Sequence, residues 1–108
     1  MVDASASMAA REGKGTRLDL AKERLLPLLE RAPEALLVRA GERPEAFGPA
    51  PGVALRERLL ALEAKDRRAD LEAAIALGRR LLKAPVVVAT DGPAPLGVEG
   101  YLGVGSPQ

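Results

Sequence analysis

The apolar residues in the first third of the chain recur at helical spacing. Leu18, Ala21, Leu25, Leu28 and Ala32 follow one another at intervals of three or four positions, which places them on one face of an α-helix. Charged residues occupy many of the positions between them. We therefore predict a helix in this segment, with its apolar face buried against the rest of the protein.

The same segment carries signals for the two ends of the helix. Thr16, with Asp19 three residues later, resembles a weak capping box, and residues 13–15 predict a flexible turn before it. Pro33 marks the C-terminal end. Pro27 lies inside the helix and has no backbone N–H, so we expect a kink there or a cost of about 3 kcal/mol.

Two further helices are predicted in the second half of the chain. Residues 53–62 carry leucines and a valine at helical spacing. Asp70 is a residue type that favours the N-cap position, and a third helix should follow it. Its apolar stripe runs from Leu71 to Leu82 and includes Gly78, where the missing side chain would allow close approach to a sheet.

Short apolar runs between the helices predict strands. Residues 35–38 and 86–89 are uniformly apolar, as in parallel strands that are covered on both faces. Residues 1–2 end a first strand, residues 101–105 form a last one, and the proline-rich region around 46–47 suits an edge strand. This order indicates a single α/β domain over the whole chain, a Rossmann-like three-layer sandwich with a mostly parallel central sheet.

The composition excludes several kinds of function. The chain has no cysteine and no histidine, which excludes thiol catalysis, Ser-His-Asp triads and the usual zinc and haem sites. Its net charge is +1, and Phe47 and Tyr101 are its only aromatic residues, so we expect no nucleic-acid partner. No apolar run approaches the roughly 20 residues of a membrane span, so we expect no membrane insertion by this segment.

Asp3, Ser5 and Ser7 form a D-x-S-x-S pattern directly after the first predicted strand. One carboxylate and two hydroxyls on a short loop supply the oxygen ligands that Mg²⁺ prefers. The alternative is a loop whose polar side chains complete its own turn and cap the next helix.

Thr90-Asp91-Gly92 follows another predicted strand. Because the carboxyl ends of parallel strands meet at one edge of a sheet, Asp91 should lie at the same edge as Asp3. The alternative for Asp91 is a structural one, since Asp-Gly is a common turn pair.

These residues resemble the von Willebrand factor A (vWA) family. The D-x-S-x-S loop, Arg17-Leu-Asp-Leu-Ala-Lys22, Ala69-Asp70-Leu71-Glu-Ala-Ala and Thr90-Asp91-Gly92 stand in the family's order over nearly the whole chain. The resemblance extends to bacterial BatA-like membrane-anchored vWA proteins, in which a segment like Gly41-Glu-Arg-Pro-Glu-Ala-Phe-Gly-Pro49 recurs.

The resemblance implies a metal-ion-dependent adhesion site, with Asp3, Ser5, Ser7 and Asp91 as ligands of Mg²⁺ or Mn²⁺. The threonine ligand of the family falls at Ala69, which has no side-chain oxygen, so metal binding would be weakened or lost. The implied function is binding, not catalysis. An acidic side chain of a protein partner would occupy the open coordination position of the metal.

Two alternatives remain open. A metal-free vWA scaffold would bind partners through other faces in a membrane-associated assembly, and Ala69 favours it. A Mg²⁺-dependent phosphatase would use Asp3, but the aspartate-based motif needs a second aspartate where this chain has Ser5. The resemblance further implies a soluble segment of a parent protein anchored to the bacterial membrane.

The resemblance also implies a domain truncated at both ends. The first strand is almost missing before Asp3, and a further helix and strand are expected after residues 101–105. An incomplete sheet leaves backbone donors and acceptors without partners, which invites pairing with another chain. We therefore expect a homo-oligomer or a rearrangement through the incomplete sheet.

Overall fold

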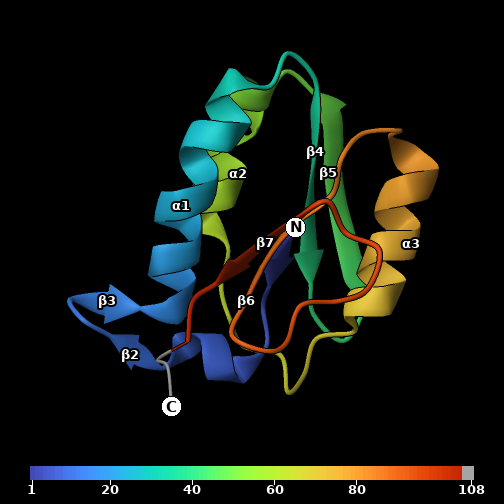
Figure 1. Cartoon of the computed structure of the whole chain (residues 1–108). Helices are drawn as coiled ribbons and strands as arrows, with labels where there is room; N and C mark the ends of the chain where they lie inside the picture. Colours follow the sequence, from blue (N-terminus) through green and yellow to red (C-terminus); the bar gives the residue numbers. More distant parts are fainter. Residues whose placement is uncertain (106–108) are drawn as a thin grey trace.

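The computed structural model describes residues 1–105 (Figure 1). Helices and strands alternate along the chain, as the apolar pattern predicts. In chain order the elements are β1 Val2–Asp3, η1 Ala6–Ala9, β2 Arg11–Glu12, β3 Gly15–Thr16, α1 Arg17–Arg31, β4 Ala35–Ala40, β5 Pro44–Ala50, η2 Gly52–Leu55, α2 Arg56–Ala61, α3 Leu71–Leu81, β6 Val87–Thr90 and β7 Gly100–Gly103.

The central sheet has five strands in the order β5-β4-β1-β6-β7. Strand β1 is its shortest member and lies in the middle, with Val2 opposite Arg39 of β4 and Ala89 of β6. All neighbours are parallel except β5, which runs antiparallel to β4 at the edge. The prediction of a mostly parallel sheet with a proline-bearing edge strand is therefore confirmed.

Helices cover both faces of this sheet. Figure 1 shows α1 and α2 on one side and α3 on the other. Because both faces are covered, a strand such as β6 needs apolar residues on both of its sides, and its sequence supplies them. The structure is thus a mixed α/β fold of the Rossmann-like type, as predicted.

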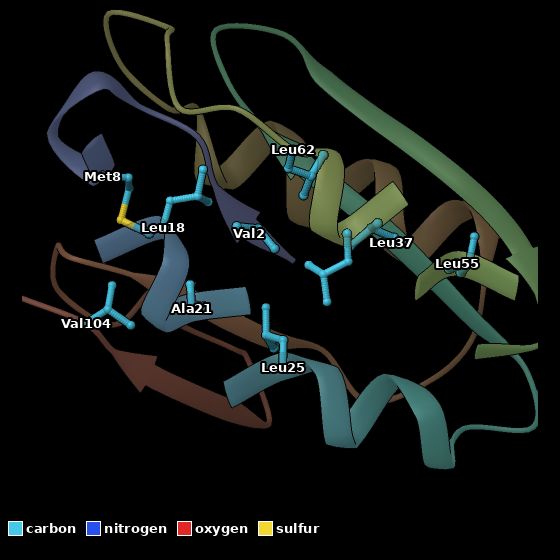
Figure 2. Close-up of a cluster of buried hydrophobic side chains, with 11 residues drawn as sticks. Val2, Met8, Leu18, Ala21, Leu25, Leu37, Leu55, Leu62 and Val104 are labelled. Atoms are coloured by element: carbon cyan, nitrogen blue, oxygen red, sulfur yellow. The ribbon is translucent and has the colours of Figure 1, made fainter. Parts of the chain in front are cut away.

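The main core lies between the sheet and the layer of α1 and α2 (Figure 2). Leu18, Ala21 and Leu25 of α1 are buried there. A smaller cluster of Val38, Ala40 and Ala74 lies on the face covered by α3. The larger cluster consists of Val2, Met8, Leu18, Ala21, Leu25, Leu37, Leu55, Leu59, Leu62, Ala89 and Val104.

Helix α1 begins with the predicted capping box. The hydroxyl of Thr16 accepts a hydrogen bond from the backbone N–H of Asp19 at 3.1 Å, and Asp19 Oδ2 accepts one from the N–H of Thr16 at 2.9 Å. The helix continues through Pro27 to Arg31. Leu28 is 47% exposed, so the prediction that its side chain is buried was wrong.

Gly52 sets how closely η2 approaches the end of α1. Its N–H donates a hydrogen bond to the carbonyl of Ala32 at 3.0 Å. A Cβ at this position would lie 1.7 Å from the carbonyl oxygen of Leu29. Only glycine fits here, because any side chain would overlap the backbone of α1.

Several predicted elements differ in detail. The helix expected over residues 53–62 is a 3-10 turn, η2, followed by a short α2. A small β2-β3 hairpin replaces the flexible turn before α1, with Gly13 at its tip in the left-handed region (φ 63°). A Cβ at Gly78 would meet Val38 at 3.7 Å, an ordinary contact, so close packing does not require glycine there.

The predicted boundaries of two strands shift by one residue, to Val87–Thr90 and to a start at Gly100. Both strands lie at the expected places in the sheet. Within residues 1–105, no helix has the length and apolar character needed to cross a membrane.

Candidate functional site

Asp3 is the last residue of β1, at the carboxyl edge of the sheet and in its middle. Its side chain is almost completely buried. Oδ1 accepts a hydrogen bond from the backbone N–H of Ser5 at 2.9 Å, which turns the chain out of the strand. Oδ2 accepts one from the hydroxyl of Thr90 at 2.6 Å, which links β1 to β6.

Ser5 and Ser7 continue the same loop. Their hydroxyl oxygens lie 3.1 Å apart, within hydrogen-bonding distance. Ser5 is buried and Ser7 is exposed, while Met8, at the other side of the 3-10 turn η1, is fully buried in the main core. The buried methionine fixes the loop, and the two hydroxyls face each other at the carboxyl edge of the sheet, which we call the rim.

Thr90 is a member of this cluster that the sequence did not single out as a site residue. It is fully buried, donates its hydroxyl hydrogen to Asp3, and accepts a hydrogen bond from the N–H of Gly92 at 3.0 Å. The signal in the sequence was its place in Thr90-Asp91-Gly92, next to a predicted ligand. Its role is to orient the Asp3 carboxylate.

Asp91 pairs with the first residue of α1. Its Oδ2 lies 2.9 Å from the Nη1 of Arg17, whose Nε lies 3.1 Å from Oε1 of Glu12. Both hydrogen bonds raise the pKa of Arg17, and the bond with Glu12 has the larger effect, followed by the bond with Asp91. In the sequence, the segment that begins at Arg17 resembles a helix of the vWA family. Nothing in the sequence indicated that the Arg17 guanidinium reaches the rim.

Asp66 holds a second segment against the Asp3 loop. It pairs with Ser5 in an isolated parallel bridge, and its carboxylate binds Arg39 Nη2 at 2.9 Å and the N–H of Glu42 at 2.8 Å. Both hydrogen bonds lower the pKa of Asp66, the one from the Arg39 guanidinium most and the one from the N–H of Glu42 next. A Cβ at Gly41 would lie 2.0 Å from Asp66 Oδ2, so this ion pair requires glycine beside it.

The segment before α3 contributes structure and no ligand. Ala69 packs against the smaller apolar cluster. Asp70 Oδ1 accepts a hydrogen bond from the N–H of Ala73 at 3.0 Å. Asp70 is therefore the N-cap of α3, as predicted.

Tyr101 closes the other side of the rim. Its side chain extends from β7, and its hydroxyl donates a hydrogen bond to the carbonyl of Gly92 at 2.7 Å. The residue is 43% exposed. The loop that carries Asp91 is thus tied to the sheet at Thr90 and at Tyr101.

The fit to a metal ion is partial. Asp3, Ser5 and Ser7 place one carboxylate and two hydroxyls on the loop after β1, the donor types that a hard cation takes, and both oxygens of Asp3 already accept hydrogen bonds. Asp91 fits the same ion only if Arg17 releases it. No group of three or more acidic, histidine or cysteine side chains suited to a metal occurs in the described part of the chain.

No family model matches the chain, and no curated protein or solved structure matches it either. What the arrangement offers chemically is an acidic and hydroxyl-bearing cluster at the carboxyl edge, bounded by a guanidinium.

Proposed function

We propose that this chain is a vWA-like protein-interaction module that binds its partner at the carboxyl edge of the sheet. In this proposal, Mg²⁺ or Mn²⁺ is held by Asp3, Ser5, Ser7 and Asp91, and an acidic side chain of the partner completes its coordination. The observation that supports it best is the loop at the end of the central strand, where the Asp3 carboxylate accepts the N–H of Ser5 and the hydroxyls of Ser5 and Ser7 lie 3.1 Å apart.

The residues of the rim would have different roles in binding the partner. When bound, the metal would supply positive charge for a partner carboxylate. Asp3 would supply the negative charge that holds the cation, and Thr90 would keep the carboxylate in place through its 2.6 Å hydrogen bond. Helix α1 starts at the same rim, since the N–H of Arg17 bonds the carbonyl of Ala10, and its N-terminus favours an anionic partner.

A metal-free scaffold is the second candidate, and one contact favours it. The guanidinium of Arg17 already neutralises the Asp91 carboxylate at 2.9 Å. Ala69 also offers no oxygen at the position where the vWA resemblance expects one. In this form the chain would bind partners through other faces and without a divalent ion, within an assembly whose parent protein is anchored to a membrane.

Calorimetric titration with Mg²⁺ and Mn²⁺ separates the two candidates. For the metal-dependent module we expect saturable binding that is lost in Asp3→Asn and strengthened in Arg17→Gln, because the second change frees Asp91. Glu23→Gln is the matched control, since it removes one exposed carboxylate on α1. It should bind like the parent protein.

The decisive comparison is between the parent protein and Arg17→Gln. If neither binds the ions, the metal-dependent proposal is wrong and the metal-free scaffold stands. If both bind them with equal affinity, and Asp3→Asn does too, the ions bind elsewhere and the site assignment is wrong.

A further inference from the structure

A cavity of about 230 Å³ lies between α2 and the antiparallel edge of the sheet. Strands β4 and β5 form one wall, and α2 with the segment that follows it forms the other. None of the proposed metal ligands, Asp3, Ser5, Ser7 and Asp91, lines this cavity. It is therefore a second hollow of the molecule, with a chemistry of its own.

One part of the cavity is apolar. Leu62 belongs to the main core, and Phe47 packs against that core from β5. Ala61, the last residue of α2, also lines the cavity. Because a cavity of about 150 Å³ can hold a benzene molecule, this space has room for a small ring or a similar apolar group.

Most of the charged groups around the cavity are already paired. Arg39 binds Asp66 at 2.9 Å, and its Nη1 lies 3.6 Å from Oε1 of Glu45. Lys65 lies 3.9 Å from Glu63. With Asp66 included, three carboxylates offset the three cations that line the cavity. The local charge is thus close to balanced, which disfavours a ligand with several negative charges.

Arg58 is the cation of the lining that has no acidic partner. Its guanidinium lies over the ring of Phe47, 5.0 Å from the ring centroid. Within residues 1–105, no carboxylate forms an ion pair with it. The contact with the ring favours this position of the guanidinium, and a guanidinium can bind one carboxylate through two parallel hydrogen bonds.

We propose that this cavity binds a small organic acid that has one carboxylate and an apolar body. The carboxylate forms an ion pair with Arg58, and the apolar body lies against Phe47 and Leu62. Glu45 and Glu63 line the same cavity, so they repel an acid that carries a second carboxylate. The lining thus selects for an acid with a single negative charge.

A fluorinated acid tests this directly. The probe is 4-fluorobenzoate, and its fluorine NMR signal is followed at neutral pH in the presence of EDTA. We expect saturable broadening of this signal by the 108-residue chain. The uncharged 4-fluorobenzamide has the same ring and should bind about tenfold more weakly or worse, because it cannot form the ion pair. The dianion 4-fluorophthalate should also bind more weakly than the probe.

Changes in the protein give the second arm. Arg58→Gln should weaken binding of 4-fluorobenzoate by about tenfold or more, because a hydrogen-bonded charge pair is lost. Arg56→Gln makes the same change on the same helix, at a residue that does not line the cavity, and should bind like the parent protein. Ala61→Leu should fill the cavity and abolish binding, whereas Ala54→Leu, outside the lining, should not. All four residues are exposed, so thermal unfolding should show that each variant is folded.

The proposal is overturned if 4-fluorobenzoate does not bind, or if Arg58→Gln or Ala61→Leu binds it as well as the matched control. Equal binding of the amide or of the dianion also overturns it, because the single charge would then not be recognised. If an acetylated peptide ending in phenylalanine displaces the probe at a far lower concentration than benzoate does, the cavity binds the end of a protein chain and the assignment to a small acid is wrong. None of these outcomes depends on metal binding at the rim, since EDTA is present throughout.

Discussion

At Gly52, a single hydrogen atom in place of a side chain allows two backbones to meet. A Cβ would lie 1.7 Å from the Leu29 carbonyl oxygen and 2.8 Å from that of Ala32. We expect Gly52→Ala to lower the free energy of unfolding by about 1–3 kcal/mol or more, as overpacking does. Urea unfolding measures it. Gly92→Ala is the control, because its Cβ would meet the Thr90 hydroxyl at an ordinary 3.6 Å, and an equal loss in both would contradict this reason.

Single residues also show where sequence-based prediction stops. It was predictable that Asp3, Ser5 and Ser7 share one loop, because the pattern is local, and the structure places them there. The ion pair of Asp91 with Arg17 was not, because the two residues lie 74 positions apart. The fold brings such residues together, and no local pattern marks the guanidinium as a neighbour of the rim.

The start of α1 allows a test at the scale of one element. Thr16→Ala removes the hydroxyl that accepts the Asp19 N–H, and we expect a loss of about 1 kcal/mol in the free energy of unfolding, typical of an N-cap. Urea unfolding again measures it. Thr16→Ser keeps the hydroxyl and should stay close to the parent protein. If serine costs as much as alanine, the threonine methyl and not the cap is responsible.

Long elements were predictable and short ones were not. Helices α1 and α3 combine a cap residue with apolar positions at helical spacing, and both appear where the pattern places them. The two-residue strands of the β2-β3 hairpin are too short to show any period. The exposure of Leu28 had another cause: it lines a cavity between α1 and the sheet, so its side chain is not fully covered.

For the whole molecule, the Arg39–Asp66 ion pair predicts a response to acid. The guanidinium of Arg39 holds the pKa of Asp66 below its usual value in the folded protein, so the folded state favours the carboxylate. The ion pair contributes fully to stability above the pKa that Asp66 has in the unfolded protein. This contribution is lost as the pH falls through the pKa of Asp66 in the folded protein. We expect a shallower loss of thermal stability between about pH 5 and pH 2 in Asp66→Asn than in the parent protein.

The same variant should also be less stable at neutral pH, because the buried guanidinium of Arg39 loses its closest charged partner and keeps only Glu45, at 3.6 Å. Glu23→Gln, which changes an exposed carboxylate, is the control at every pH. Parallel melting-temperature profiles for Asp66→Asn and the parent protein would contradict the role of this pair.

At the same scale, the α/β class and the mostly parallel sheet followed from the alternation of strands and helices. Strand β1 lies in the centre of the sheet, between β4 and β6. These two neighbours are the apolar runs that the sequence marked as strands covered on both faces. The register between β1 and β4, which sets Val2 opposite Arg39, was not predictable from the sequence. Register is set by pairing over the whole sheet and not by any one segment.

Tyr101 gives the molecule an optical property of its own. It is the only tyrosine and the chain has no tryptophan, so ultraviolet emission comes from one phenol without a brighter chromophore to mask it. That phenol is hydrogen-bonded to the carbonyl of Gly92, beside Asp91. Any event that moves the Asp91 loop should change the intensity of this emission, and the unlabelled protein therefore carries its own fluorescent reporter of the rim.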